Sequence, residues 1–348
     1  MIKNNKKKRK ICVAIFSRAN YGSIRKVLEQ LKKSPKIDLQ ILIGGSANIS
    51  KYGLVSDLIR QDRFRIDEEI YFQVEGATPT TMVKTTALGM IEIATALERL
   101  KPDIVLTVGD RYETLSTVVS AAYMNIPVAH TMGGEITGTI DESIRHAITK
   151  FSHIHFPANN KARENIIRMG EEKKNVFNVG CPRIDLVKSC LSKTPKNLNR
   201  LVFGRKLGVG EEFDLNKDFT TLMHYPVTTE FGQNFKNMCK ILDAVKKINL
   251  PKLIFWPNAD AGSEEISRAI RLYRETNLLK NSWFIKNLDH YAFFHILNNT
   301  KCLIGNTSSA IREGSFIGVP TVSVGTRQNG RDRGKNIINA SYNNKKIY

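Results

Sequence analysis

Two carboxylates follow two predicted strands, at positions where a general acid and a general base could act. The run Ile104–Val108, continuously apolar or β-branched, predicts a strand buried on both faces of a parallel sheet, and Asp110 comes two residues after it. Residues 128–130 predict the next strand, and Glu135 lies in the Gly-Gly loop behind it. Because ligands bind at the carboxyl ends of parallel strands, both carboxylates are expected on one rim of the sheet, where they could exchange protons with a substrate.

Each of these carboxylates, taken alone, has a simpler interpretation. Asp110 could cap the following helix, and Glu135 could be a solvated loop residue. Four more ionisable side chains follow within about two helical turns, namely Asp141, Glu142, Arg145 and His146. This concentration of titratable groups favours a catalytic region over isolated capping residues.

A second candidate region begins at Gly305, where small polar residues stand between a predicted strand and a predicted helix. Such a junction predicts an anion-binding nest, with the hydroxyls of Thr307 and Ser308 beside free N–H groups at the positive end of a helix. Glu313, about one turn later, could accept hydrogen bonds from a ribose diol, and Arg327 could bind a phosphate through two parallel hydrogen bonds. The simpler interpretation is N-capping by Ser308 alone.

Predicted strands and helices alternate along both halves of the chain. Residues 10–33 pair a strand with an amphipathic helix, and residues 252–275 repeat the pair. This alternation predicts an α/β fold with two Rossmann-like, doubly wound domains that face a cleft, over residues 1–185 and 186–348. Residues 185–219 are polar and irregular, which predicts a connection and not a core segment. No GxGxxG follows the first strand, so a dinucleotide fingerprint is absent.

Composition excludes several other classes of protein. The net charge is +20, but the basic residues are spread along the chain among 33 acidic ones, and only residues 6–10 form a charge run, so no nucleic-acid partner is expected. No apolar run approaches the roughly 20 residues that cross a bilayer, and no signal peptide is recognisable, which favours a cytoplasmic protein without membrane association. The five cysteines are scattered, and neither a metal site nor a cofactor motif is predicted.

Six motifs, taken together, resemble one enzyme family. GDRYE, HTMGGEITGTIDESIRHAITK, HYPVT, PNADAGS, GNTSSAIREG and GTRQNGR occur in the order and spacing of the hydrolysing UDP-N-acetylglucosamine 2-epimerases, which act in sialic and nonulosonic acid biosynthesis. The resemblance runs from Ser17 to Asn336. It implies a glycosyltransferase-B-like fold that holds the nucleotide mostly in the second domain. It also implies a UDP-sugar substrate, no cofactor, and a homodimer or homotetramer.

The chemistry that this resemblance implies is an elimination followed by a hydration. A base removes the proton at sugar C2 while UDP leaves C1, and water then adds to the 2-acetamidoglycal to give the free 2-epimer, of N-acetylmannosamine type. The catalytic residues implied by the motifs are Asp110, Glu135, Asp141, Glu142 and His224. Those implied at the substrate are Arg18, Gly22, Arg111, Arg145, His146, Asn258, Asn287, Thr307, Ser308, Glu313 and Arg327. The substrate is UDP-N-acetylglucosamine or a UDP-diacetamido relative.

The sequence departs from the family at Met132, where relatives carry Glu or His in the H-x-x-G-G-E motif. A thioether cannot exchange a proton, so Glu135, His130 or Asp141 performs that step, or the protein is a catalytically impaired sugar-nucleotide binder. A glycosyltransferase of the same fold is a further alternative. The family pattern continues past Tyr348, so we expect its final crossover helix to be missing from this chain.

Overall fold

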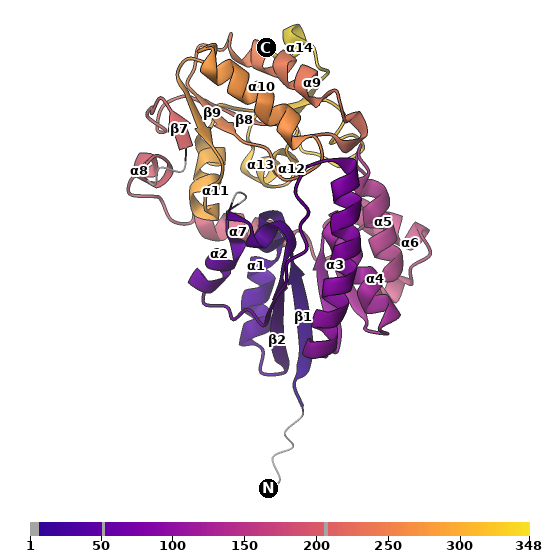
Figure 1. The fold of residues 1–348 in the computed structure, drawn as a ribbon. Coiled ribbons are helices and arrows are strands. Elements are labelled where there is room, and N and C mark those ends of the chain that lie inside the picture. Colours follow the sequence, from indigo (N-terminus) through magenta and orange to yellow (C-terminus); the bar gives the residue numbers. More distant parts are fainter. Residues whose placement is uncertain (1–6, 51–52, 205–207) are drawn as a thin grey trace. The chain divides into compact units, whose positions relative to one another are not determined.

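The computed structural model describes residues 7–50, 53–204 and 208–348, so Lys6 of the basic N-terminal run lies outside the described residues. The chain divides into two compact units. Unit 1 comprises Met1–Gly76, Thr80–Ile136 and Asp141–Arg183, and unit 2 comprises Ala77–Pro79, Thr137–Ile140 and Ile184–Tyr348. In Figure 1 most of unit 1 is coloured indigo to magenta and most of unit 2 magenta to yellow.

Unit 1 is built on a six-stranded sheet in the order β3-β2-β1-β4-β5-β6, and every pairing in it is parallel. Its strands are β1 Arg9–Ile15, β2 Ile37–Ile43, β3 Glu68–Glu69, β4 Ile104–Val108, β5 Val128–Thr131 and β6 Ile154–Phe156. Its helices are α1 Arg18–Lys33, η1 Gly45–Asn48, α2 Val55–Gln61, α3 Pro79–Leu100, α4 Tyr112–Tyr123, α5 Asp141–Phe151, α6 Asn160–Arg168 and η3 Lys173–Asn175.

Both faces of the central part of this sheet are buried, which explains the apolar residues on both faces of β1, β4 and β5. Successive residues of β1 point to opposite faces. Cys12 and Ala14 join a cluster with residues of α3, α4 and α5, whereas Val13 and Ile15 join a cluster with residues of α1 and α2. Figure 1 shows α1 and α3 on opposite sides of the strands.

Unit 2 is built on a seven-stranded sheet in the order β13-β12-β11-β8-β9-β10-β7, in which only β7 runs antiparallel to its neighbour. Its strands are β7 Gly208–Gly210, β8 Thr220–Met223, β9 Lys252–Phe255, β10 Ser282–Ile285, β11 Cys302–Gly305, β12 Thr321–Val324 and β13 Ile337–Ala340. Its helices are α8 Leu198–Val202, η4 Thr228–Glu230, α9 Asn234–Val245, α10 Ser263–Glu275, α11 His290–Asn299, α12 Ser308–Ile311, α13 Glu313–Ile317 and α14 Asn344–Ile347.

The second sheet is also buried on both faces. Leu253 and Phe255 of β9 belong to one apolar cluster and Ile254 to the other. The period of two that places them follows from the extended backbone. Helix α7, Pro182–Leu191, begins at the division between the units and supplies buried side chains to unit 2.

The prediction that residues 185–219 are an irregular connection outside the core is wrong in part. The segment contains most of α7, all of α8 and strand β7, while residues 205–207 lie outside the described part. Val187, Val202 and Phe219 are fully buried in the core of unit 2. The apolar residues of this segment lie among polar ones in short elements, so the sequence shows no hydrophobic periodicity long enough to predict them. Within the described residues, no helix is long and apolar enough to cross a membrane.

Candidate active site

Asp110 lies at the carboxyl end of β4, in the turn that leads to α4. Gly109 takes φ +76°, a left-handed conformation that glycine adopts without strain. The residue that caps α4 is Arg111, and its side chain makes no capping bond, so Asp110 is not the helix cap. The Asp110 carboxylate instead forms an ion pair with Arg145 of α5.

Arg145 joins the two loops that carry the predicted catalytic carboxylates. Its side chain is 0% exposed, Nε lies 3.1 Å from Asp110 Oδ2, and Nη1 donates to the Glu135 carbonyl oxygen at 2.5 Å. A buried guanidinium is stable only where acceptors surround it. We therefore propose that Arg145 positions Asp110 and the Glu135 loop, while the direct substrate contact that the sequence resemblance implies stays a prediction.

His130 is hydrogen-bonded to the turn that carries Asp110 and is buried beside it. Burial lowers the pKa of His130 to about 4, although its bond to the Gly109 carbonyl opposes that shift. At neutral pH the ring is uncharged, and Nε2, as the donor, lies 2.7 Å from the Gly109 oxygen. Nδ1 faces the Thr149 hydroxyl at 3.4 Å. With both nitrogens facing protein atoms, His130 fixes the turn before Asp110, and the alternative that it replaces the family acid/base is disfavoured.

Met132, at the departure from the family motif, is buried in a strained conformation. Its φ is +63°, in the left-handed region that side chains with a Cβ rarely adopt. The residue is 2% exposed and packs with Val108 and Ala129 in an apolar cluster of unit 1. Strain of this kind costs of order 1–3 kcal/mol and concentrates at functional sites. The loop between β5 and Glu135 is therefore held in a special shape, while position 132 itself offers no titratable group.

Helix α5 presents the remaining predicted groups of unit 1. Asp141 and Glu142 lie in its first turn, where acidic side chains interact favourably with the free N–H groups of a helix. Glu142 lies 4.0 Å from Nε2 of His146, one turn further along. Burial, followed by the charge of Arg145, lowers the pKa of His146, so the imidazole is neutral at pH 7.

The other substrate-binding candidates of unit 1 have mixed surroundings. Arg111 forms an ion pair with the fully buried Glu113 at 3.0 Å, so its charge already has a partner. Arg18 opens α1 directly after β1, and Gly22 is buried within that helix. Asn20, which the sequence analysis did not select, connects two strand ends: it accepts from the N–H of residue 16 at 3.3 Å and donates to the carbonyl of residue 108 at 3.1 Å.

In unit 2, Asn306 connects the loops that follow three strands. Its side chain accepts from the Tyr225 N–H at 2.7 Å and donates to the Tyr225 carbonyl at 2.8 Å. Its own carbonyl accepts from Gln328 at 2.7 Å and from Arg327 at 3.2 Å. Gly305, just before it, has φ +128°, and a Cβ there would lie 2.2 Å from a carbonyl oxygen of β8. Sequence reasoning found this motif but not the residue at its centre, since these partners are distant in sequence.

The predicted anion nest differs from expectation in its helix. Thr307 is the cap, accepting from the Ser309 N–H at 3.2 Å, so capping by Ser308 is wrong. Ser308 opens α12, which has only 4 residues, and Glu313 opens the separate helix α13. A short helix contributes less dipole than the continuous one that was predicted. Glu313 is fully buried, so its carboxylate is enclosed by protein and does not face solvent.

His224 directly follows β8 and is buried. Burial lowers its pKa to about 3, and the positive charge of Arg327 acts in the same direction. Its Nε2 lies 3.5 Å from the Asn306 side-chain nitrogen, and its ring meets the edge of Tyr342 at 5.9 Å. Asn258 and Asn287, the other two candidates, follow the carboxyl ends of β9 and β10. The topology thus gathers the candidates of unit 2 at one edge of its sheet.

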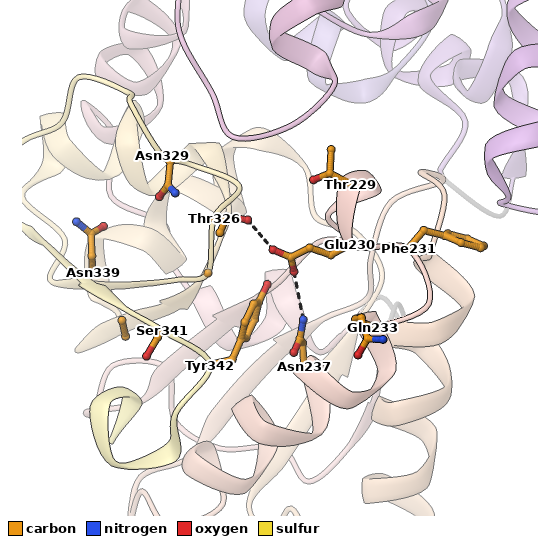
Figure 2. Close-up of a pocket in the computed structure, with 12 residues that line it drawn as sticks. Thr229, Glu230, Phe231, Gln233, Asn237, Thr326, Asn329, Asn339, Ser341 and Tyr342 are labelled. Atoms are coloured by element: carbon orange, nitrogen blue, oxygen red, sulfur yellow. Dashed lines mark hydrogen bonds between the residues drawn. The ribbon is translucent and has the colours of Figure 1, made fainter.

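Glu230 fixes the turn that carries Arg327. Its carboxylate accepts from the Thr326 hydroxyl at 2.6 Å and from Asn237 at 3.2 Å, as the dashed lines of Figure 2 show. Burial, followed by the negative charge of Glu230, raises the pKa of Tyr342. Arg327 lies over the ring of Tyr225, 5.6 Å from its centroid. In the described part of the chain, no group of three or more His, Cys, Asp or Glu side chains could hold a metal ion.

Two doubly wound α/β units, with polar side chains at the carboxyl ends of their parallel strands, define a two-domain α/β enzyme. Residues 29–348 match the family model described as UDP-N-acetylglucosamine 2-epimerase, and the chain belongs to this family of UDP-sugar 2-epimerases. It is 34% identical to the UDP-N,N'-diacetylbacillosamine 2-epimerase (hydrolyzing) of Legionella pneumophila, with 95% of this chain and 84% of that protein covered.

Two further comparisons agree with this membership. The chain is 31% identical to the GDP/UDP-N,N'-diacetylbacillosamine 2-epimerase (hydrolyzing) of Campylobacter jejuni, over 97% of this chain and 85% of that protein. The crystal structure of UDP-GlcNAc 2-epimerase from Neisseria meningitidis superposes with a TM-score of 0.76 at 16% identity, covering 97% of this chain and 89% of the other. The predicted class of two Rossmann-like α/β domains is confirmed, and the glycosyltransferase alternative is not favoured.

Proposed function

We propose that the protein is a hydrolysing 2-epimerase, which converts a UDP-2-acetamido sugar and water into the free 2-epimer and UDP. The observation that carries this proposal is the pair of carboxylate loops, at Asp110 and Glu135, that Arg145 joins on one rim of unit 1. Such a rim offers fixed proton acceptors and donors without a metal or cofactor. The hydrolysing relatives of Legionella pneumophila and Campylobacter jejuni support the same chemistry.

In the first step, a carboxylate of unit 1 takes the proton from sugar C2. The electron pair of the C2–H bond forms the C1–C2 double bond, and the C1–O bond breaks to release UDP. In the second step, water adds its oxygen to C1 of the 2-acetamidoglycal, and a proton returns to the opposite face of C2. We propose that the carboxylates of Asp110, Glu135, Asp141 and Glu142 perform these transfers, since Met132 cannot and His130 is enclosed.

We propose that unit 2 binds the nucleotide and stabilises the leaving diphosphate. The proton at C2 is weakly acidic, so charge developing on the leaving group must be met by fixed donors. Arg327 and the hydroxyls of Thr307 and Ser308 suit the phosphates, Glu313 suits the ribose, and the segment after β10 suits the base. Asn306 holds Arg327 and the loop of His224 in one network, so these donors are already oriented before substrate binds.

The first substrates to test are UDP-N-acetylglucosamine and a UDP-2,4-diacetamido sugar, each incubated with the protein in deuterated water and followed by proton NMR. We expect UDP and a free 2-epimer carrying deuterium at C2, with Asp110→Asn as the inactive control. A UDP-linked 2-epimer without release of UDP would identify a non-hydrolysing epimerase instead. No turnover of either nucleotide would refute the proposed function.

A further inference from the structure

A polar pocket lies in unit 2, next to the turn that carries Arg327. Its volume is about 630 Å³, and it is lined by residues that follow β8 and β12, by residues at the end of β13 and after it, and by Asn237 of α9. Figure 2 shows Glu230 at its centre, between Thr326 on one side and Tyr342 and Asn237 on the other. Successive side chains of the turn face different partners: Thr326 bonds Glu230, whereas Arg327 reaches the Asn306 carbonyl.

The charge of this pocket argues against a phosphate ligand. The chain carries a net charge of +20, yet neither lysine nor arginine is among the residues that line the pocket. Glu230 is the single ionisable acid among them. A diphosphate needs cationic side chains or a cluster of free N–H groups, and a carboxylate would repel it. The ligand must therefore be uncharged or bear donors.

The hydrogen-bonding groups of the pocket suit hydroxyls. The Glu230 carboxylate offers about four acceptor positions, of which Thr326 and Asn237 use two. Both donors are neutral, and a remaining position can accept a hydroxyl from a ligand. A ligand with several hydroxyls could also reach Ser341 and Thr229, which line the same space.

Two amide side chains complete the set. Gln233 and Asn329 are exposed at the pocket, and in the described structure neither side-chain amide is engaged in a hydrogen bond. An amide presents a donor and an acceptor side by side, which matches a hydroxyl or an acetamido group. Phe231, also exposed, adds an apolar surface at the rim, which a sugar ring can cover.

We propose that this pocket binds an uncharged acetamido sugar, separately from the nucleotide. The choice of sugar rests on the proposed function, because the free 2-epimer that the reaction releases belongs to this class. A sugar held there would lie against Tyr342, whose ring contacts His224. A ligand in the pocket would therefore be separated from the buried His224 by a single side chain, that of Tyr342.

The test is saturation-transfer NMR on the full chain without nucleotide, using N-acetylmannosamine as the probe and lactate as a polar, non-sugar control. Asn329→Trp and Gln233→Trp should fill the pocket, while Asn298→Trp, on an exposed position of α11, is the matched control. We expect transfer to the acetamido sugar in the wild type and in Asn298→Trp. Affinity should fall at least about tenfold in both pocket variants, which is about 1.4 kcal/mol.

Two results would overturn this proposal. No transfer to N-acetylmannosamine in the wild type would show that the pocket takes no such sugar, and transfer that survives in both pocket variants would place the sugar elsewhere. Turnover of UDP-N-acetylglucosamine, measured separately as release of UDP, tests the proposed function. Binding without turnover, or turnover without binding, therefore distinguishes the failure of one proposal from that of the other.

Discussion

Replacing Arg145 by methionine tests whether a buried guanidinium holds the two carboxylate loops in place. The side chain is wholly buried and donates to the Asp110 carboxylate and to the Glu135 carbonyl. Methionine has a comparable length but no donors, so both acceptors lose their partner. Breaking one side of a buried ion pair costs about 3–5 kcal/mol. Because 23% of the Asp110 side chain reaches solvent, we expect the lower end of that range, about 3 kcal/mol.

The chain offers an internal reference for this measurement. Both tryptophans, Trp256 and Trp283, belong to unit 2, so their fluorescence follows that unit while far-UV circular dichroism follows both. In urea, a loss of 3 kcal/mol should move the dichroism transition of unit 1 by about 1–3 M, and the fluorescence transition should stay where it is. Release of UDP from the substrate should fall at least about a hundredfold, since a misplaced catalytic group loses its near-attack geometry.

Two further variants make this prediction refutable. Arg60→Met removes an exposed ion pair of the same unit, with Glu69 at 3.1 Å, and should cost less than about 1 kcal/mol. The double variant of Arg145→Met with Asp110→Asn should be less destabilised than the sum of the two single changes, by about 1–3 kcal/mol. If Arg145→Met resembles Arg60→Met in stability and retains turnover, the positioning role is wrong.

Three other expectations follow from particular contacts. Gly305→Ala places a Cβ 2.2 Å from a backbone carbonyl oxygen, whereas the Cβ of Gly318→Ala, at φ +86°, meets nothing within 4 Å. In urea titrations read by tryptophan fluorescence, the free energy of unfolding should fall by about 3 kcal/mol or more for Gly305→Ala and by about 1 kcal/mol for Gly318→Ala. Equal losses of stability would contradict the collision at Gly305. Burial holds the pKa of His130 at about 4, below its ordinary 6.5, so the unfolded chain binds the proton first as the pH falls. The contribution of His130 to the free energy of unfolding should therefore decline between pH 6.5 and 4, by roughly 2–3 kcal/mol at pH 4.5, beside a separate decline from His224, whose pKa is about 3. A His130→Gln variant that shows the same total decline as the wild type would refute this source. Glu230→Gln should weaken the hydrogen bonds that hold the turn after β12, and we expect KM to rise several-fold with kcat nearly unchanged. Turnover is measured as UDP release, beside the exposed control Glu275→Gln. A loss confined to kcat would count against a binding role.

Much of the fold could be predicted from periodicity. Ile104–Val108 and residues 253–256 are rich in apolar and β-branched residues and are followed by polar turns. Both segments lie in central parallel strands, β4 and β9, because strands covered on two faces need apolar residues on both. Residues 185–219 were mispredicted for the opposite reason. Val187, Val202 and Phe219 are buried singly, through tertiary contacts of short elements, and a sequence window records only their polar neighbours.

Some residues of the candidate site could likewise be located from the sequence, and others could not. Strand ends can be located from sequence, and with them Asp110, Glu135 and Arg327, because polar residues that follow a buried strand must lie at its carboxyl edge. The roles of Arg145 and Asn306 could not be located. Each bonds to residues far away along the chain, 35 positions for Arg145 and Asp110 and 81 for Asn306 and Tyr225, and no local pattern encodes such a pairing.

The sequence by itself therefore determined which residue types stand at the ends of the buried strands, and with them the chemistry that the chain can perform. Only the tertiary structure decided which of those groups are enclosed. His130 and His224 stand in motifs that resemble catalytic ones, yet folding buries both and lowers the pKa of each imidazole, while Met132 is enclosed in an apolar cluster. The reason is physical: a side chain's solvent exposure and partners are set by the elements packed around it, whereas its position along the chain sets only its identity.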